Sequence, residues 1–185
     1  MGSADPRSDA ELVAAVNGGD WGAFDVIYFR YRDWAYRLAW RFCGDEVEAQ
    51  DVVQEVFVYL AGKFPGLVLR AEVTTLLYPA VKHTSLALKR KRQRMGSGGA
   101  GNEAETAAPV CPAEPDAERA ELAAALGGLS EAHREVLLMR FVDDMTLEEI
   151  GVSLGIPLGT AKSRLHHALG ALRENPRLRK YFENA

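Results

Sequence analysis

The chain has 185 residues, and 48% of them are hydrophobic, which is enough to bury the core of one domain or of two small ones. It contains no run of about 18 apolar residues and no apolar N-terminal segment, so we expect neither a transmembrane helix nor export, and we expect a cytoplasmic location. The net charge of −4 weighs against nucleic acid as a partner, but the positive charge is concentrated in two places.

These two basic patches are separated by an acidic stretch. Residues 82–94 contain six Lys or Arg and no acid, and residues 162–180 contain six against the single acid Glu174. Residues 103–118 carry five acids and no base. A single basic run is usually a solvated face, but two patches that each close a helical segment favour nucleic-acid binding.

Apolar residues at helical spacing predict four helical segments in the N-terminal half, 9–18, 21–43, 46–61 and 68–94. Asp9 is the expected N-cap of the first segment and Asp20 that of the second. The aromatic residues of the second segment are assigned mostly to the core. The fourth segment should kink or split at Pro79, because proline lacks the backbone N–H that a helix needs.

The segment 46–61 has two distinct faces. Its apolar side chains share one side of the helix, which is formed by Ala49, Val53, Val56, Phe57 and Leu60. Asp51, Gln54 and Glu55 cluster on the other side. Such a face is either a solvated acidic surface or a docking surface for a basic partner.

Residues 95–116 are rich in Gly, Ala and Pro and poor in large apolar residues. A segment of this kind cannot bury enough surface to offset its ordering entropy, so we predict a flexible linker. It separates two small helical domains, 1–94 and 117–185. In the second domain, helices are expected over 116–126 and 131–141, the latter capped by Ser130.

Residues 145–173 read as a helix, a tight turn and a second helix. Thr146 and Glu149 form a capping box at the start of the first helix. Gly155 can adopt the left-handed conformation that ends this helix, and Pro157 cannot continue it. The second helix should bury one face, formed by Ala161, Leu165, Ala168, Leu169 and Leu172.

The opposite side of this second helix carries polar residues. Ser163, His166 and His167 point outward, flanked by Thr160, Lys162 and Arg164. A helix of this kind suits the DNA major groove, where side chains read donors and acceptors on base edges. The alternative is an ordinary helical hairpin with a solvated polar face.

The order of the motifs resembles a bacterial sigma factor of the extracytoplasmic-function group of the sigma-70 family. In the N-terminal half the matching runs are G-D-W-G-A-F, R-L-A-W-R-F-C-G-D and A-Q-D-V-V-Q-E-V-F. In the C-terminal half they are A-L-G-G-L-S-E-A-H-R-E-V-L-L-M-R-F and T-L-E-E-I-G-V-S-L-G-I-P-L-G-T-A-K-S-R-L-H-H-A-L. The resemblance covers nearly the whole chain.

The resemblance implies a protein that binds core RNA polymerase and directs promoter-specific transcription initiation. Asp51, Gln54 and Glu55 match the positions that contact the β′ clamp helices, and the β flap is the second expected contact. The residues that match the reader of the −35 element are Gly159, Thr160, Lys162, Ser163, Arg164, His166 and His167. An anti-sigma partner is a further expectation that rests on the resemblance alone.

The segment that matches the −10 reader departs from the family pattern. The family has a Trp-Leu pair followed by Ala-Arg-Asn, whereas this chain has L-L-Y-P-A-V-K-H, with Leu76 in place of the Trp. Lys82 and His83 replace the Arg-Asn pair. The −10 candidates are therefore the basic residues of this segment, Lys82, His83, Lys89, Arg90, Lys91 and Arg92.

Two alternatives remain open from the sequence. The first is a helix-turn-helix regulator that does not bind polymerase, which would need a dimer interface and palindromic half-sites. The second is an enzyme. However, neither metal-ligand spacing nor a phosphate-binding loop links the cysteines Cys43 and Cys111 or the four histidines, so no catalytic site, metal or cofactor is expected.

Overall fold

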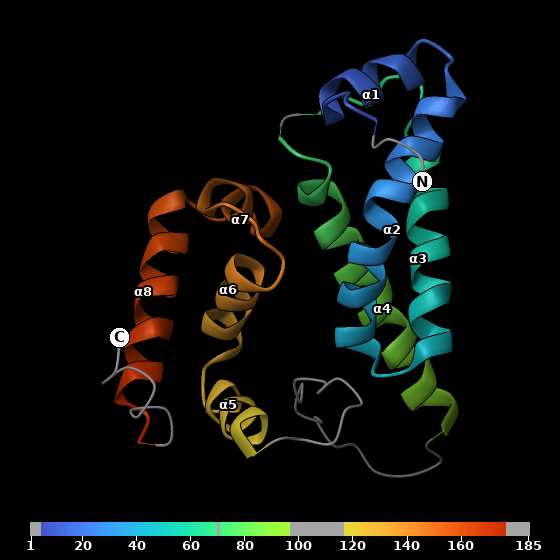
Figure 1. Cartoon of the computed structure of the whole chain (residues 1–185). Coiled ribbons are helices and arrows are strands. Elements are labelled where there is room, and N and C mark those ends of the chain that lie inside the picture. The colour runs from blue at the N-terminus through green and yellow to red at the C-terminus, as the bar shows by residue number, and fades with distance from the viewer. Residues whose placement is uncertain (1–4, 70, 97–116, 177–185) are drawn as a thin grey trace. The chain divides into compact units, whose positions relative to one another are not determined.

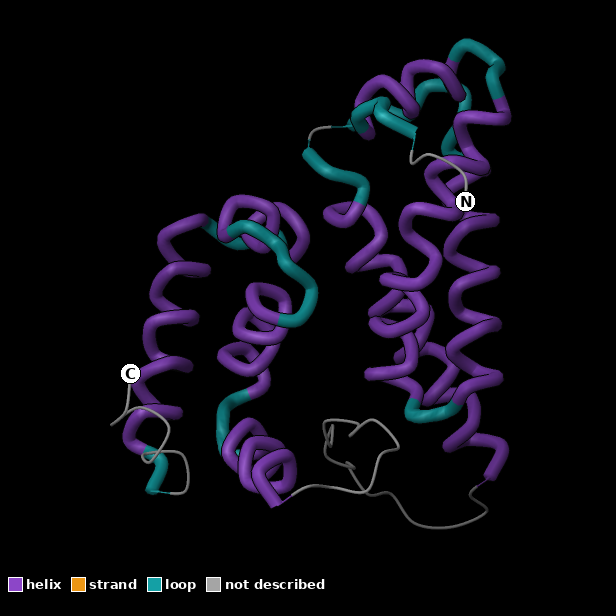
Figure 2. The backbone as a smooth tube through the Cα atoms, in the orientation of Figure 1, coloured by secondary structure: helices purple, strands orange, loops and turns teal. Residues whose placement is uncertain are grey.

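The computed structural model describes residues 5–69, 71–96 and 117–176. Within these ranges all regular secondary structure is helical, which confirms the all-α prediction (Figure 2). The chain divides into two compact units, Met1–Gly101 and Asn102–Ala185, which we call unit 1 and unit 2. Most of the predicted flexible linker, 95–116, lies outside the described residues.

Unit 1 is a bundle of four helices, α1 (Asp9–Asn17), α2 (Trp21–Cys43), α3 (Glu46–Ala61) and α4 (Thr74–Gly96) (Figure 1). α2, α3 and α4 pack against one another, and α1 packs against α2. Every helix contributes fully buried apolar side chains, which include Leu12, Val16, Ile27, Leu38, Val52, Val56, Leu77, Tyr78 and Val81. Unit 1 therefore has a hydrophobic core of its own.

The caps of the first two helices differ from the prediction. Ser8, not Asp9, is the N-cap of α1, because its hydroxyl accepts a hydrogen bond from the Glu11 N–H while the Glu11 side chain returns to Ser8. Asp9 is instead buried against α2. Asp20 occupies the N-cap position of α2, but its side chain makes no capping hydrogen bond.

The predicted segment 68–94, a helix or a pair of helices kinked or split at Pro79, forms one helix that does not split and that starts later than predicted. α4 starts at Thr74 and continues through Pro79 as one helix. Pro79 is exposed and lies in the second turn, so the helix loses one hydrogen bond close to its start. The buried side chains on both sides of the proline, Leu77, Tyr78 and Val81, hold the two parts of the helix on the same core.

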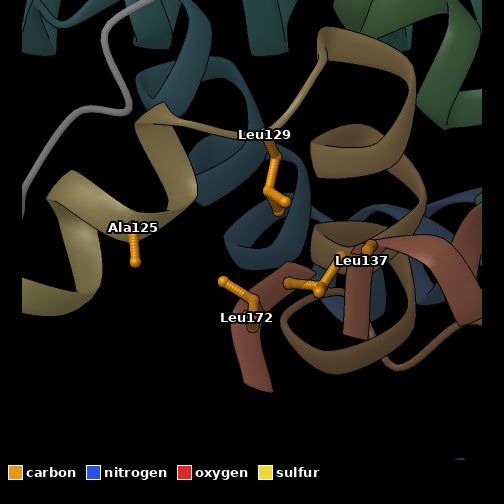
Figure 3. Close-up of a cluster of buried hydrophobic side chains, with 5 residues drawn as sticks. Ala125, Leu129, Leu137 and Leu172 are labelled. Carbon is orange, nitrogen blue, oxygen red and sulfur yellow. The ribbon is translucent and has the colours of Figure 1, made fainter. Parts of the chain in front are cut away.

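Unit 2 contains α5 (Ala117–Gly127), α6 (Glu131–Phe141), α7 (Leu147–Leu154) and α8 (Leu158–Glu174). α8 packs against both α6 and α7. A buried cluster joins α5, α6 and α8 through Ala125, Leu129, Leu137, Ala168 and Leu172, and Figure 3 shows four of these side chains converging. Leu165 and Leu169 are partly buried against the same cluster.

The helix-turn-helix has the predicted local chemistry. Thr146 caps α7, and the reciprocal bond from the Thr146 N–H to the Glu149 carboxylate is 2.6 Å long. Gly155 ends α7 in the left-handed region with φ 64°. The turn also brings two backbones close together, because a Cβ at Gly151 would lie 3.0 Å from the carbonyl oxygen of Ile156.

Candidate functional site

The polar face of α3 is presented to solvent. Asp51, Gln54 and Glu55 are all exposed, whereas Val52 and Val56 of the same helix are buried. Burial of the apolar side fixes the rotation of the helix, so the three polar side chains form a surface with a defined orientation. The structure thus brings together the three residues predicted to dock on polymerase.

A groove of about 770 Å³ runs between α2 and α3 beside this face. Gln54 lines the groove together with Tyr28, Phe57 and Val58. Val58 lies in the last turn of α3 and is 67% exposed. The polar face of α3 therefore adjoins an apolar groove that sequence reasoning missed.

The assignment of most α2 aromatic residues to the core was wrong, because the buried residues of this helix are Ala23, Ile27, Ala35, Leu38, Ala39 and Cys43, and its aromatic side chains are partly buried or exposed. Trp21 and Phe29 remain 52% and 62% exposed. The guanidinium of Arg32 lies 5.0 Å from the centre of the Phe29 ring, where the ring face attracts a cation. Unit 1 thus presents aromatic side chains to solvent on α2.

The basic residues of α4 do not form one face. Lys82 and Lys89 are two turns apart and share one side of the helix. His83 and Arg90 share a second side, about 100° around the helix axis from the first. Lys91 lies on the side opposite Lys82. The six −10 candidates therefore surround the helix instead of lining a single strip.

One of these candidates is engaged within the protein. Arg92 forms an ion pair of 3.1 Å with Glu48 of α3. Because both side chains are partly exposed, the pair contributes little to the free energy of unfolding. It joins the C-terminal part of α4 to α3. This contact occupies the Arg92 guanidinium in the free chain.

A second groove, of about 730 Å³, lies between α3 and α4. Leu76, Pro79 and His83 all line it, so three of the residues that depart from the family pattern meet in one place. Glu55 lines the opposite wall. At the same wall the ammonium of Lys63 lies 4.4 Å from the centre of the Tyr59 ring.

The outer side of α8 carries the predicted −35 residues. Gly159, Lys162, Ser163, His166 and His167 are exposed, and Thr160 and Arg164 are partly buried. The inward side of the helix holds Ala161, Ala168 and Leu172, which are buried in unit 2. The predicted division of this helix into an inward and an outward face is therefore confirmed.

The packing of α6 against α8 adds a residue that the sequence analysis did not select for DNA. The ring of His133, in the first turn of α6, stacks on the ring of His167 with 5.9 Å between their centroids. His166 meets His167 edge to face at 5.8 Å. No local signal identifies His133, because its proximity to α8 depends on how the two helices pack.

In the part of the chain that the structure describes, no three His, Cys, Asp or Glu side chains gather in a way that could hold a metal ion. Among the same residues, no helix is long and apolar enough to cross a membrane.

Comparisons with known proteins agree with this two-unit arrangement. Residues 27–95 match the model of Sigma-70 region 2, and residues 125–174 match that of Sigma-70, region 4. The ECF RNA polymerase sigma factor SigW of Bacillus subtilis (strain 168) is 30% identical over 178 residues, which cover 89% of this chain and 95% of SigW. The chain belongs to the extracytoplasmic-function (ECF) group of the sigma-70 family.

Solved structures share the fold of this sigma factor. CnrH, in complex with the cytosolic domain of CnrY, matches with a TM-score of 0.65 at 20% identity and covers 96% of this chain and 99% of its own. The sigma factor RpoE from Bartonella quintana, in complex with the anti-sigma factor NepR, matches with a TM-score of 0.61 at 21% identity. The latter match covers 82% of this chain and 94% of RpoE.

Family membership establishes the general function. The chain is a sigma factor that binds core RNA polymerase and directs transcription initiation. Sigma factors are non-enzymatic regulators of transcription. A helix-turn-helix regulator that never binds polymerase is not favoured, because the match to region 2 spans the unit that carries the α3 face.

Proposed function

We propose that unit 1 docks this sigma factor on the β′ clamp helices of core polymerase through Asp51, Gln54 and Glu55, and that unit 2 contacts the β flap. The observation that carries the docking assignment is the exposure of these three polar side chains on a helix whose other side is buried. The adjoining α2–α3 groove adds exposed apolar surface, which gives the interface a core inside a polar rim.

We further propose that the two basic helices divide the promoter between them. The outer face of α8, from Gly159 to His167, reads the −35 element, where each well-placed base contact is worth about 1–3 kcal/mol. The basic residues of α4 and the α3–α4 groove act at the −10 element. The proposed domains are 1–94 for docking and −10 contact, 95–116 as a flexible acidic linker, and 117–185 for −35 contact.

The proposed docking and promoter contacts require no chemical reaction catalysed by the chain. Lysine and arginine contacts to phosphate give affinity that falls as salt rises. Unstacking a base costs a few kcal/mol, which the sigma factor offsets by holding the opened strand. Because polymerase holds both units on the same DNA, their separate modest affinities act together. We place the chain in the cytoplasm, where it meets polymerase and DNA.

We also propose that an anti-sigma factor regulates this chain. The support is indirect: RpoE, with the same fold, is in complex with an anti-sigma factor. Unit 1 also offers exposed apolar side chains, including Phe29 and Val58, that a protein partner would cover. A partner of this kind should compete with core polymerase for the chain.

The docking proposal is tested by measuring the affinity of the purified full chain for bacterial core polymerase. A variant with Asp51→Ala, Gln54→Ala and Glu55→Ala should bind at least about tenfold more weakly, because it loses charged and polar contacts at the centre of the interface. A variant with Asp20→Ala and Glu46→Ala removes the same number of carboxylates elsewhere in unit 1 and should bind like the parent. Equal affinity for all three proteins would contradict the assignment of this face.

A further inference from the structure

Helix α1 holds the middle of the connection between α3 and α4, which spans residues 62–73, through a single side chain. The Asn17 amide nitrogen donates to the carbonyl of Leu67 at 2.9 Å. Its amide oxygen accepts from the backbone N–H groups of Gly66, at 2.7 Å, and Leu67, at 3.2 Å. Asn17 therefore satisfies three backbone groups of a chain segment that belongs to no helix or strand.

Asp9 holds the C-terminal end of the same connection. The carboxylate of Asp9 accepts from the Val73 N–H at 3.0 Å. Val73 directly precedes α4, and its carbonyl accepts from the N–H groups of Leu76 and Leu77 in the first turn. The same carboxylate is paired with Arg30 of α2 at 2.8 Å, so the first turn of α4 is joined to both α1 and α2.

These bonds act on a wall of the α3–α4 groove. Leu67, which Asn17 holds, lines that groove together with Leu76, Pro79 and His83. α4 also packs against α2 and α3, and these contacts do not involve α1. Loss of the α1 bonds would therefore leave α4 in its bundle and release the chain that leads into it.

We propose that Asp9 and Asn17 are positioning residues for promoter opening. By fixing the middle and the C-terminal end of the connection, the two ends of α1 hold the groove wall and the first turn of α4 ready to receive the opened −10 strand. A preformed surface traps unstacked bases without first ordering itself, so its loss should slow opening. This inference rests on the proposed −10 role of α4 and assigns a task to α1, which carries no proposed DNA contact.

The test uses holoenzyme assembled from core polymerase and the full chain. Promoter fragments are first selected from a randomised pool by the parent holoenzyme. Permanganate reactivity of unpaired thymines then gives the rate of opening on a fully paired fragment. The yield of short transcript gives the extent of initiation on a fragment whose −10 strands are mismatched. Asn17→Ala should slow opening of the paired fragment by about tenfold, which corresponds to the loss of one or two net hydrogen bonds.

On the mismatched fragment Asn17→Ala should initiate like the parent, because the opening step is already complete. Its core affinity should also be unchanged. Asp9→Asn should behave in the same way, which gives a second route to the answer if one variant folds poorly. A merely structural role would lower core binding and initiation on both templates together.

Ser8→Ala is the matched control. It removes the capping box of α1 without touching the connection, and should open the paired fragment at the parent rate. The proposal would be overturned if holoenzyme with the Asn17→Ala variant opened the paired fragment as fast as the parent. It would also be overturned if this holoenzyme failed equally on both fragments. A parent chain that opens no fragment at all would instead overturn the proposed function.

Discussion

Lys162 is an exposed cation on the outer face of α8, the face that we propose reads the −35 element. A lysine that neutralises one phosphate releases condensed counterions, so its contribution appears in the salt dependence of binding more clearly than in sequence preference. Its neighbour Ser163 carries no charge and can contact DNA only by hydrogen bonding.

Lys162→Ala should weaken holoenzyme binding to every promoter fragment by a similar factor. The slope of log affinity against log salt should become shallower by about 0.9, the value for one phosphate contact. Titrations at several salt concentrations measure this slope. Arg37→Ala, an exposed cation on α2, provides the control, and an unchanged slope for Lys162→Ala would show that Lys162 does not contact phosphate.

Asp9 also links the stability of unit 1 to pH. Burial alone would raise the pKa of its carboxyl, but hydrogen bonds from Tyr31, Val73 and Arg30 outweigh burial and hold the pKa below its usual range. As the pH falls, the unfolded chain therefore takes up this proton first. The stabilisation from Asp9 is present above the ordinary aspartate pKa of about 3.9 and is lost as the pH falls through the folded value.

Asp9→Asn should accordingly make unit 1 less stable at pH 7 and less sensitive to acid. All three tryptophans, Trp21, Trp34 and Trp40, lie in unit 1, so their fluorescence follows its unfolding by urea. The free energy of unfolding should fall less between pH 7 and pH 3 in the variant than in the parent. Equal losses would mean that the Asp9 carboxylate is not the acid-sensitive group.

The helix-turn-helix depends on a close approach that only glycine permits. A side chain at Gly151 would meet the carbonyl of Ile156, which belongs to the turn between α7 and α8. Neither backbone can retreat easily, since α7 is capped at Thr146 and Gly155 ends it in a left-handed conformation. The angle at which α8 leaves α7 is thus set by atoms of the main chain.

Gly151→Ala should destabilise unit 2 by about 1–3 kcal/mol through overpacking, and weaken binding to −35 DNA. Gly170→Ala lies on α8 with no atom near its added Cβ, and should be neutral or stabilising by up to about 1 kcal/mol. Hydrogen exchange of the unit 2 amides compares the two variants. Similar protection in both would show that the turn can relax around the added methyl group.

At the scale of the whole molecule, the two units have separate cores. The cluster that includes Leu137 and Leu172 lies entirely within unit 2, and the side chains around Leu38 and Val56 lie within unit 1. Damage to one core should consequently leave the function of the other unit intact. This separation lets polymerase docking and −35 recognition be tested apart in the full chain.

Leu172→Ala should cost unit 2 about 2–5 kcal/mol, because it leaves a cavity in the cluster at a side chain that is only 6% exposed. Exchange of unit 2 amides should accelerate, while the tryptophan transition and core affinity stay as in the parent. A matching shift of the tryptophan transition would mean that the two units unfold as one block.

Local signals in the sequence predict α3 and the helix-turn-helix well. α3 has its predicted bounds because Asp45 caps it and Gly62 follows it, and α7 follows from Thr146 and Gly155. The start of α4 could not be predicted, since the residue before it, Val73, donates a hydrogen bond from its N–H to the Asp9 carboxylate across 64 residues. The outward positions of α8 follow from helical periodicity, but the stacking of His133 on that face depends on tertiary packing.

The one-sided packing of α8 has an evolutionary consequence. Because its core side consists of Ala161, Ala168 and Leu172, substitutions on the outer side leave the cluster intact and cost little stability. Under the −35 and −10 roles proposed above, lineages can therefore explore new −35 preferences by drift at Ser163 or His166 while the −10 determinants in the other unit stay under separate selection. A duplicated gene could in this way acquire its own set of promoters one base pair at a time.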